Sequence, residues 1–162
     1  MKIKLQKKNL ALYLALIIVL MLVIWFAIRG TQDTIHFEEE TIFIINSSKE
    51  EIEMSVLIAE DNEQKEKGLM GRETLCDNCG MLFVFEEEVE GGFWMKDTYV
   101  SLSIAFISES GTIMDIQHMV PETTEVHIPE EPYRFALEVN RGFFEDNDIM
   151  LGDNVVIPDI YK

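Results

Sequence analysis

The stretch GMLFVFEEEVEGGFWMKDTYVSLSIAFI, residues 80–107, decides the fold. Apolar side chains alternate in 81–85 and again in 102–107 with the period of two that is typical of strands, so we predict two buried strands. Between them, Gly91 and Gly92 permit a backbone geometry that other residues resist. They present the tetrapeptide FWMK at 93–96, whose large apolar groups beside a cation predict the rim of a binding site.

Strand patterns continue on both sides of this stretch, separated by turn residues. A short helix is predicted near 61–70 and a helical turn within 142–149, whereas the prolines of 121–132 predict a loop. Many short strands with little helix predict a mostly β domain, a compact antiparallel sandwich or barrel with one or two short helices. The further predicted strands are 41–46, 51–59, 112–119, 133–140 and 155–157.

The N-terminal part differs in character from the rest. Residues 10–28 carry no charge, and as a helix they would reach about 28 Å, close to the roughly 30 Å of a membrane core. Lysines precede this run and acidic residues follow it, so we predict a basic cytoplasmic tail at 1–9, an acidic tether at 29–40 and an extracytoplasmic domain at 41–162. We favour an uncleaved transmembrane signal anchor in the cell membrane over a cleaved signal peptide, because no small-residue cleavage site follows the apolar run.

The charge of the chain limits the classes of partner that we expect it to bind. Only 13 residues are basic against 30 acidic ones, and five of the basic residues precede position 30. Residues 30–162 therefore carry eight basic and 30 acidic side chains, a net charge of −22. Such a field repels nucleic-acid phosphates, so we expect a small-molecule or protein ligand outside the cell and no nucleic acid.

Cys76 and Cys79 form the one CxxC motif, too few thiols for a disulfide scaffold or a four-thiolate zinc site. Outside the cell a small disulfide is the preferred interpretation. A soft-metal site completed by histidines or methionines is the second choice, and a redox pair the third, because acidic Asp77 between the cysteines disfavours a thiolate. We therefore assign no metal.

No catalytic motif is present. His36, His118 and His127 lie far apart, and a packed or rim histidine is the preferred interpretation of His118. The chain has no nucleophile elbow, no HExxH sequence and no glycine-rich phosphate loop. We therefore lean away from an enzyme and expect no cofactor.

Five ordered blocks of sequence resemble one family, the bacterial and archaeal domain of unknown function 192. The resemblance covers roughly residues 52–160 and implies a compact, jelly-roll-like β domain, but it implies no activity. The blocks are GLMGRETL (68–75), CGMLFVFE (79–86), FWMKDT (93–98), LSIAFI (102–107) and FALEVNRGFFEDNDIMLGD (135–153).

The chain departs from the pattern of that family, which reads FWMKNT followed by PLD. Asp97 stands in place of the amide, Ser101 in place of the proline and Ser103 in place of the acidic residue. A role that needs a carboxylate at position 103 is therefore in doubt, and Ser101 leaves a turn less rigid than proline would.

One group of residues is the best candidate for a site. Glu138 sits on a strand with apolar neighbours and needs a partner if it is buried. Its partner could be Arg72 or Lys96 in a structural ion pair, or these groups could orient a ligand over an aromatic floor. The candidates are Arg72, Phe93, Trp94, Lys96, Asp97 and Glu138.

The leading hypothesis is a membrane-anchored extracytoplasmic binding or interaction module. The first alternative is an enzyme acting on an envelope or extracellular small molecule, with Glu138 and Asp97 as acid and base. The second is a soft-metal binder that uses Cys76 and Cys79.

Overall fold

A computed structural model describes residues 4–29 and 35–162. The chain divides into two units, of which the first ends at Ile35 and the second, residues 36–162, contains every strand. Helix α1 (Lys4–Arg29) belongs to the first unit, and its described large apolar side chains are 48 to 63% exposed. Within the described part of the chain no helix combines the length and the apolar character that crossing a membrane requires, so the structure does not support the predicted transmembrane helix.

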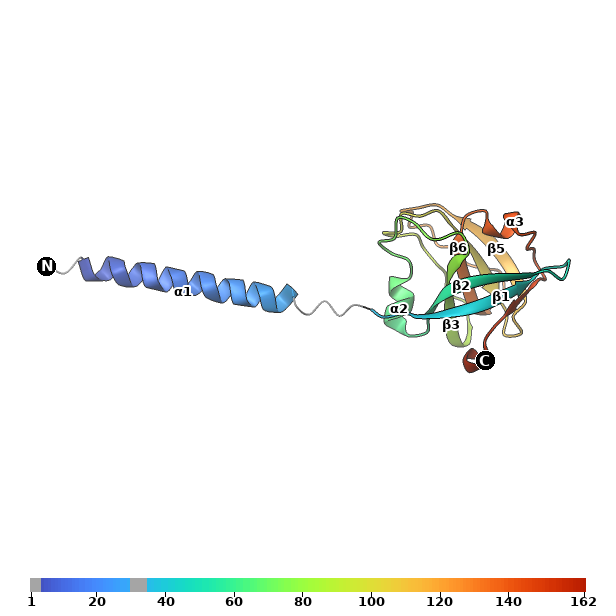
Figure 1. The fold of residues 1–162 in the computed structure, drawn as a ribbon, viewed down its shortest axis with the longest axis horizontal. Helices are drawn as coiled ribbons and strands as arrows, with labels where there is room; N and C mark the ends of the chain where they lie inside the picture. The colour runs from blue at the N-terminus through green and yellow to red at the C-terminus, as the bar shows by residue number, and fades with distance from the viewer. Residues whose placement is uncertain (1–3, 30–34) are drawn as a thin grey trace. The chain divides into compact units, whose positions relative to one another are not determined.

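The second unit is built on one curled sheet in the order β5-β4-β6-β3-β2-β1-β7. Figure 1 shows these strands wrapped around a shared interior, with β1 and β2 in front and β5 behind. The mostly β prediction is confirmed. The strands are β1 (Glu38–Ile45), β2 (Glu51–Ala59), β3 (Cys79–Val89), β4 (Leu102–Ile107), β5 (Ile113–Met119), β6 (Tyr133–Asn140) and β7 (Asn154–Val156).

The predicted antiparallel sandwich or barrel is confirmed only in part. The described strands form a single half-barrel sheet, and β2 pairs with β3 in parallel, Ser55 opposite Cys79 and Ala59 opposite Phe83. The reason lies in residues 60–78, which contain a helix and form a crossover long enough to return the chain in its original direction. All the other strand pairs are antiparallel, including the predicted hairpin of β1 and β2.

The two edges of the sheet meet at one end. Thr112, next to β5, forms an isolated bridge with Asn154 of β7, and the amide of Val155 donates to the carbonyl of Gly111 over 2.8 Å. Gly111 has a φ of +87°, and a Cβ there would lie 2.4 Å from the carbonyl oxygen of Val155. A glycine is therefore required where the sheet curls toward closure.

Both faces of the central strands are buried, as the apolar runs predict. In β3, Leu82 and Val84 face a cluster inside the curl, whereas Met81 and Phe83 face a second cluster on the other side. All six residues of β4 are buried, so neighbouring positions in these runs contribute to two different cores. The face with the second cluster is the one on which Glu138 lies, because Glu138 pairs with Met81 and Ile104 in register.

Three short helical segments complete the unit. Helix α2 (Asn62–Lys67) confirms the predicted short helix and begins with a capping box between Asp61 and Gln64. It ends three residues earlier than predicted because Gly68 adopts a φ of +45°. Helix α3 (Phe143–Asp146) confirms the predicted helical turn, and the 3-10 helix η1 (Asp159–Tyr161) was not predicted.

Candidate functional site

The predicted blocks come together in the loops that cover the second cluster. The amide of Gly71 donates to the carbonyl of Asp97 over 2.8 Å, and the amide of Tyr99 donates to the carbonyl of Arg72 over 3.2 Å. The amide of Arg141, just after β6, donates to the carbonyl of Ser101 over 3.0 Å. These bonds join the loop around residue 72 to the loop 93–101, so the backbone segments that carry Arg72 and Asp97 lie side by side.

The predicted aromatic floor is divided between the core and the surface. Phe93 is half-buried and packs against Phe83 at a centroid distance of 4.8 Å, whereas Trp94 is 46% exposed. The Lys96 ammonium lies 5.4 Å from the Trp94 ring, a cation–π contact at the surface. Met95, between Trp94 and Lys96, is fully buried and anchors the loop to the second cluster.

Gly92 has a different role from the predicted one. Its φ is not positive, but a Cβ there would lie 2.5 Å from Ile128 and 2.8 Å from the carbonyl oxygen of His127. The neighbouring residue Phe93 forms a two-way backbone bridge with His127. Glycine is needed at 92 because the proline loop passes close by, rather than because of a special turn geometry.

Glu138 does not form the predicted ion pair. The side chain is only 4% exposed, and among the described residues it makes no hydrogen bond or ion pair, with Arg72 and Lys96 included. Its neighbours in register are the apolar side chains of Met81 and Ile104. Desolvation by burial raises the pKa of the Glu138 carboxyl to about 8, so the group is mostly protonated at neutral pH.

Cys76 and Cys79 form the predicted disulfide. The side-chain amide of Asn140 donates to the carbonyl of Cys76 over 2.8 Å and so fixes this loop to the end of β6. Both sulfur atoms are bonded to each other, which leaves no thiolate for the soft-metal hypothesis.

His118 is a rim residue, as the sequence predicts. Its Nδ1 lies 3.0 Å from the Ser103 hydroxyl, and its Nε2 lies 3.1 Å from a carboxylate oxygen of Glu145 in α3. Serine, histidine and glutamate resemble a catalytic triad in composition, but Ser103 is fully buried and cannot reach a substrate. The group therefore links β4, β5 and α3 and is no nucleophile site.

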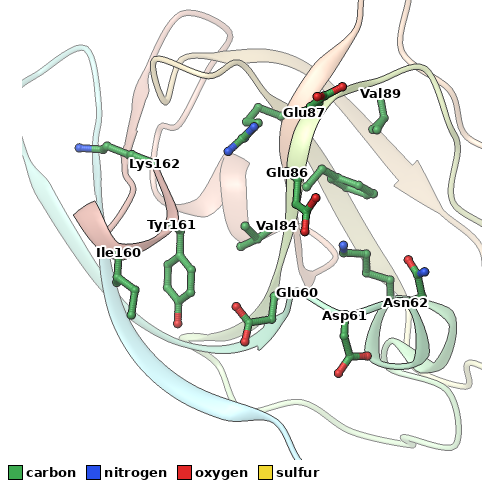
Figure 2. A pocket seen from close by; sticks show the side chains of 13 residues that line it. Glu60, Asp61, Asn62, Val84, Glu86, Glu87, Val89, Ile160, Tyr161 and Lys162 are labelled. Carbon is green, nitrogen blue, oxygen red and sulfur yellow. The ribbon is translucent and has the colours of Figure 1, made fainter.

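A large hollow lies elsewhere, beside the bulge of β3 (Figure 2). It is a cavity of about 820 Å³. The register between β3 and β6 shifts between Val84 and Val89, which leaves this part of β3 without regular partners. The cavity is lined by Glu60, Asp61, Asn62, Lys65, Val84, Phe85, Glu86, Glu87, Val89, Arg134, Ile160, Tyr161 and Lys162.

Two polar atoms of the cavity-lining residues are buried without a partner. The Tyr161 hydroxyl and Nε of Arg134 have no hydrogen-bond partner among the described residues. Tyr161 is 6% exposed, and burial, followed by the carboxylates of Glu40, Glu38 and Glu60, raises its pKa. Buried polar atoms of this kind are rare in native proteins and call for an explanation such as a ligand.

Three cationic side chains line the cavity, and two of them, Lys65 and Lys162, contact other groups of the protein. The Lys65 ammonium lies 4.9 Å from the centroid of the Phe85 ring, and burial lowers its pKa although Glu86, Asp61 and Glu60 act in the opposite direction. Lys162 contacts the Asp159 carboxylate at 3.0 Å. Arg134 forms no ion pair among the described residues, and its guanidinium carbon lies 5.8 Å from the Phe135 ring centroid.

Sequence reasoning missed this cavity. Its lining comes from four segments that are far apart in the chain, and η1, which supplies Tyr161, follows the last predicted strand. The run of Glu86, Glu87, Glu88 and Glu90 is typical of a solvated turn, whereas the first three of these belong to strand β3 and Glu86 and Glu87 line the cavity. One signal was present in the sequence, because Arg134 is one of only eight basic residues after position 29.

Comparison with known proteins identifies the family and not the activity. Solved structures that resemble the chain include a candidate transcription regulator from Sinorhizobium meliloti 1021, 32% identical with a TM-score of 0.74, and a protein of unknown function from Novosphingobium aromaticivorans DSM 12444, 27% identical with a TM-score of 0.70. The first match covers 76% of this chain and 96% of that chain, the second 74% and 85%. No curated protein matches. The family described as uncharacterized ACR, domain of unknown function 192, matches residues 43–157, and the chain belongs to this family.

Proposed function

We propose that residues 36–162 form a binding module that takes a small polar organic ligand into the cavity beside β3. The observation that carries the proposal is the cavity of about 820 Å³, two of whose lining residues have buried polar atoms without partners. Its volume lies in the range of about 300 to 1,000 Å³ that is common for ligand pockets. A ligand that bonds to these atoms would remove the cost of leaving them unpaired, about 1–3 kcal/mol each.

A thermal-shift screen of the full chain against a panel of polar metabolites tests the proposal. We expect at least one compound to raise the unfolding temperature and to lose this effect in Arg134→Gln. Arg141→Gln is the matched control, because Arg141 is an exposed arginine outside the cavity lining. If no compound stabilises the protein, or if both variants respond like the wild type, the cavity is not a binding site.

The location of the module is part of the same proposal. Residues 10–28 contain no charge, four lysines precede them, and all 30 acidic residues follow them, which favours attachment to the cell membrane with the domain outside. The test is fractionation of cells that express the full chain. Recovery in the membrane fraction after alkaline extraction supports attachment, and recovery in the soluble fraction contradicts it.

We do not extend the regulator description of the Sinorhizobium protein to this chain. Residues 30–162 carry a net charge of −22, which opposes contact with nucleic-acid phosphates. Catalysis by Glu138 and Asp97 is not proposed either, since Glu138 is buried and Asp97 is exposed in a surface loop.

A further inference from the structure

We propose that the ligand of the cavity is a zwitterion, a free amino acid or a dipeptide, whose ammonium group binds near Tyr161 and whose carboxylate binds Arg134. This inference rests on the proposed binding function and adds the chemical class of the ligand. It follows from the unequal distribution of unpaired groups around the cavity.

The Tyr161 end of the cavity favours a cation. Figure 2 shows the Glu60 carboxylate beside the Tyr161 side chain, with Val84 near both. The negative charges of Glu38 and Glu40, on β1, raise the pKa of the same hydroxyl. An ammonium group offers three hydrogen-bond donors, which suit carboxylate oxygens and the oxygen of the unpartnered hydroxyl.

Arg134 provides a place for an anion. Four acidic residues line the same cavity, yet among the described residues none of them pairs with this guanidinium. Lys162 contacts Asp159 instead, and the Lys65 ammonium lies over Phe85 with acidic residues nearby. A free guanidinium binds a carboxylate through two parallel hydrogen bonds, which gives both affinity and orientation.

The wall of the cavity suits the body of such a ligand. Val84, Val89 and Ile160 contribute apolar surface to the lining. A purely anionic ligand would meet the four lining carboxylates, and a purely cationic one would leave Arg134 unpaired. A molecule with one charge of each sign satisfies both sets of groups at once.

Calorimetric titration of the full chain, solubilised in mild detergent, tests the inference with leucyl-leucine and its two capped forms. N-acetylation removes the ammonium charge and C-amidation removes the carboxylate charge. We expect the uncapped dipeptide to bind at least about tenfold more tightly than either capped form, because a hydrogen bond to a charged group is worth about 1.5–3 kcal/mol.

Variants then assign each end of the ligand. Arg134→Gln should bind the dipeptide and its C-amide equally, and Glu60→Gln should reduce the preference for the dipeptide over its N-acetyl form. Arg134→Lys keeps the charge and should keep part of the discrimination, which separates a binding role from a folding role. Arg141→Gln should behave like the wild type.

The outcomes distinguish this inference from the binding function. Equal binding of the dipeptide and both capped forms overturns the zwitterion and leaves the cavity as a ligand site. No binding of leucyl-leucine overturns the inference as stated, while the binding function stands if another compound of the metabolite panel loses its effect in Arg134→Gln. If no compound binds in either experiment, both fail.

Discussion

Glu138 and Tyr161 show how differently one protein can treat a buried polar side chain. They are 4% and 6% exposed, and neither has a hydrogen-bond partner within the described residues. Glu138 lies among apolar side chains of the second core cluster, whereas Tyr161 lines the open cavity. An unpaired buried group is therefore a candidate for ligand binding only where its residue also lines a cavity.

The two groups also differ in how their burial can be tolerated. A carboxyl can lower its desolvation cost by taking up a proton. Burial raises the pKa of the Glu138 carboxyl to about 8, so this group is mostly protonated at neutral pH. A phenol is already neutral at physiological pH, so Tyr161 has no such alternative. Its hydroxyl needs either a partner or a ligand, and this difference can be tested by substitution.

The largest expected effect is that of Glu138→Gln at high pH. The folded pKa of about 8 exceeds the ordinary value of 4.5, so between these values the folded state holds a proton that the unfolded state has lost. Rising pH therefore lowers the free energy of unfolding across this window, by on the order of 1 kcal/mol per pH unit. Glutamine cannot ionise, so the variant should exceed the wild type in stability by on the order of 4 kcal/mol near about pH 9.

Urea titrations of both proteins between about pH 5 and pH 9 measure this difference. Near about pH 5 the two stabilities should be similar, because the glutamate is then protonated in the folded state. Parallel pH profiles would mean that the carboxyl is ionised in the folded protein and has a partner. In that case the contrast with Tyr161 would disappear.

The next effect concerns the loop that lies over the Glu138 face. Met95 is fully buried in the second cluster, so Met95→Ala should cost about 2–5 kcal/mol of unfolding free energy through the cavity that it leaves. Trp94→Ala, a change at the exposed neighbour, should stay within about 0.5 kcal/mol. Similar losses in both variants would show that Trp94 packs against the domain, contrary to the structure.

The pattern of apolar residues was sufficient to predict the strands but not their arrangement. Period-two runs located the strands because alternation reports which side chains are buried locally. The parallel pairing of β2 with β3 depends on the length and path of the crossover 60–78, a property that no single run contains. Closure of the sheet likewise depends on Gly111, whose role appears only when β7 lies beside it.

The candidate site was predicted only in part for the same reason. The block 93–98 does meet the loop at Arg72. Glu138 was expected to need a partner if it is buried, and it is buried but has no such partner among the described residues. The cavity was missed because Glu60, Arg134 and Tyr161 become neighbours only through the curl of the sheet. Each of these residues has an ordinary neighbourhood in the sequence.

A smaller effect is expected from the disulfide between Cys76 and Cys79, which lies in the loops over the Glu138 face. Replacing Cys76 and Cys79 together by serine should cost about 2 kcal/mol, since the bond closes a very short loop. Asn140 would still hold the loop through the Cys76 carbonyl. Denaturant titration with and without reductant measures the loss, and a reductant effect that persists in the double variant would argue against the disulfide as its cause.

The smallest effect has the opposite sign and tests the Tyr161 half of the comparison. Tyr161→Phe removes a buried hydroxyl that has no partner within the described residues, so without ligand it should stabilise the protein by about 1 kcal/mol. Tyr99→Phe is the matched control, because Tyr99 is exposed and should change stability very little. Thermal and urea unfolding of the ligand-free proteins provide the measurement.

The same variant should bind leucyl-leucine more weakly than the wild type, because the hydroxyl is then missing from the ammonium end. A gain in stability together with a loss of affinity is the combination expected for a group kept for binding at some cost to folding. A loss of stability would instead mean that the hydroxyl has a structural partner, such as an ordered water. Tyr161 would then resemble an ordinary core residue, and the proposed ligand site would lose one of the two groups on which it rests.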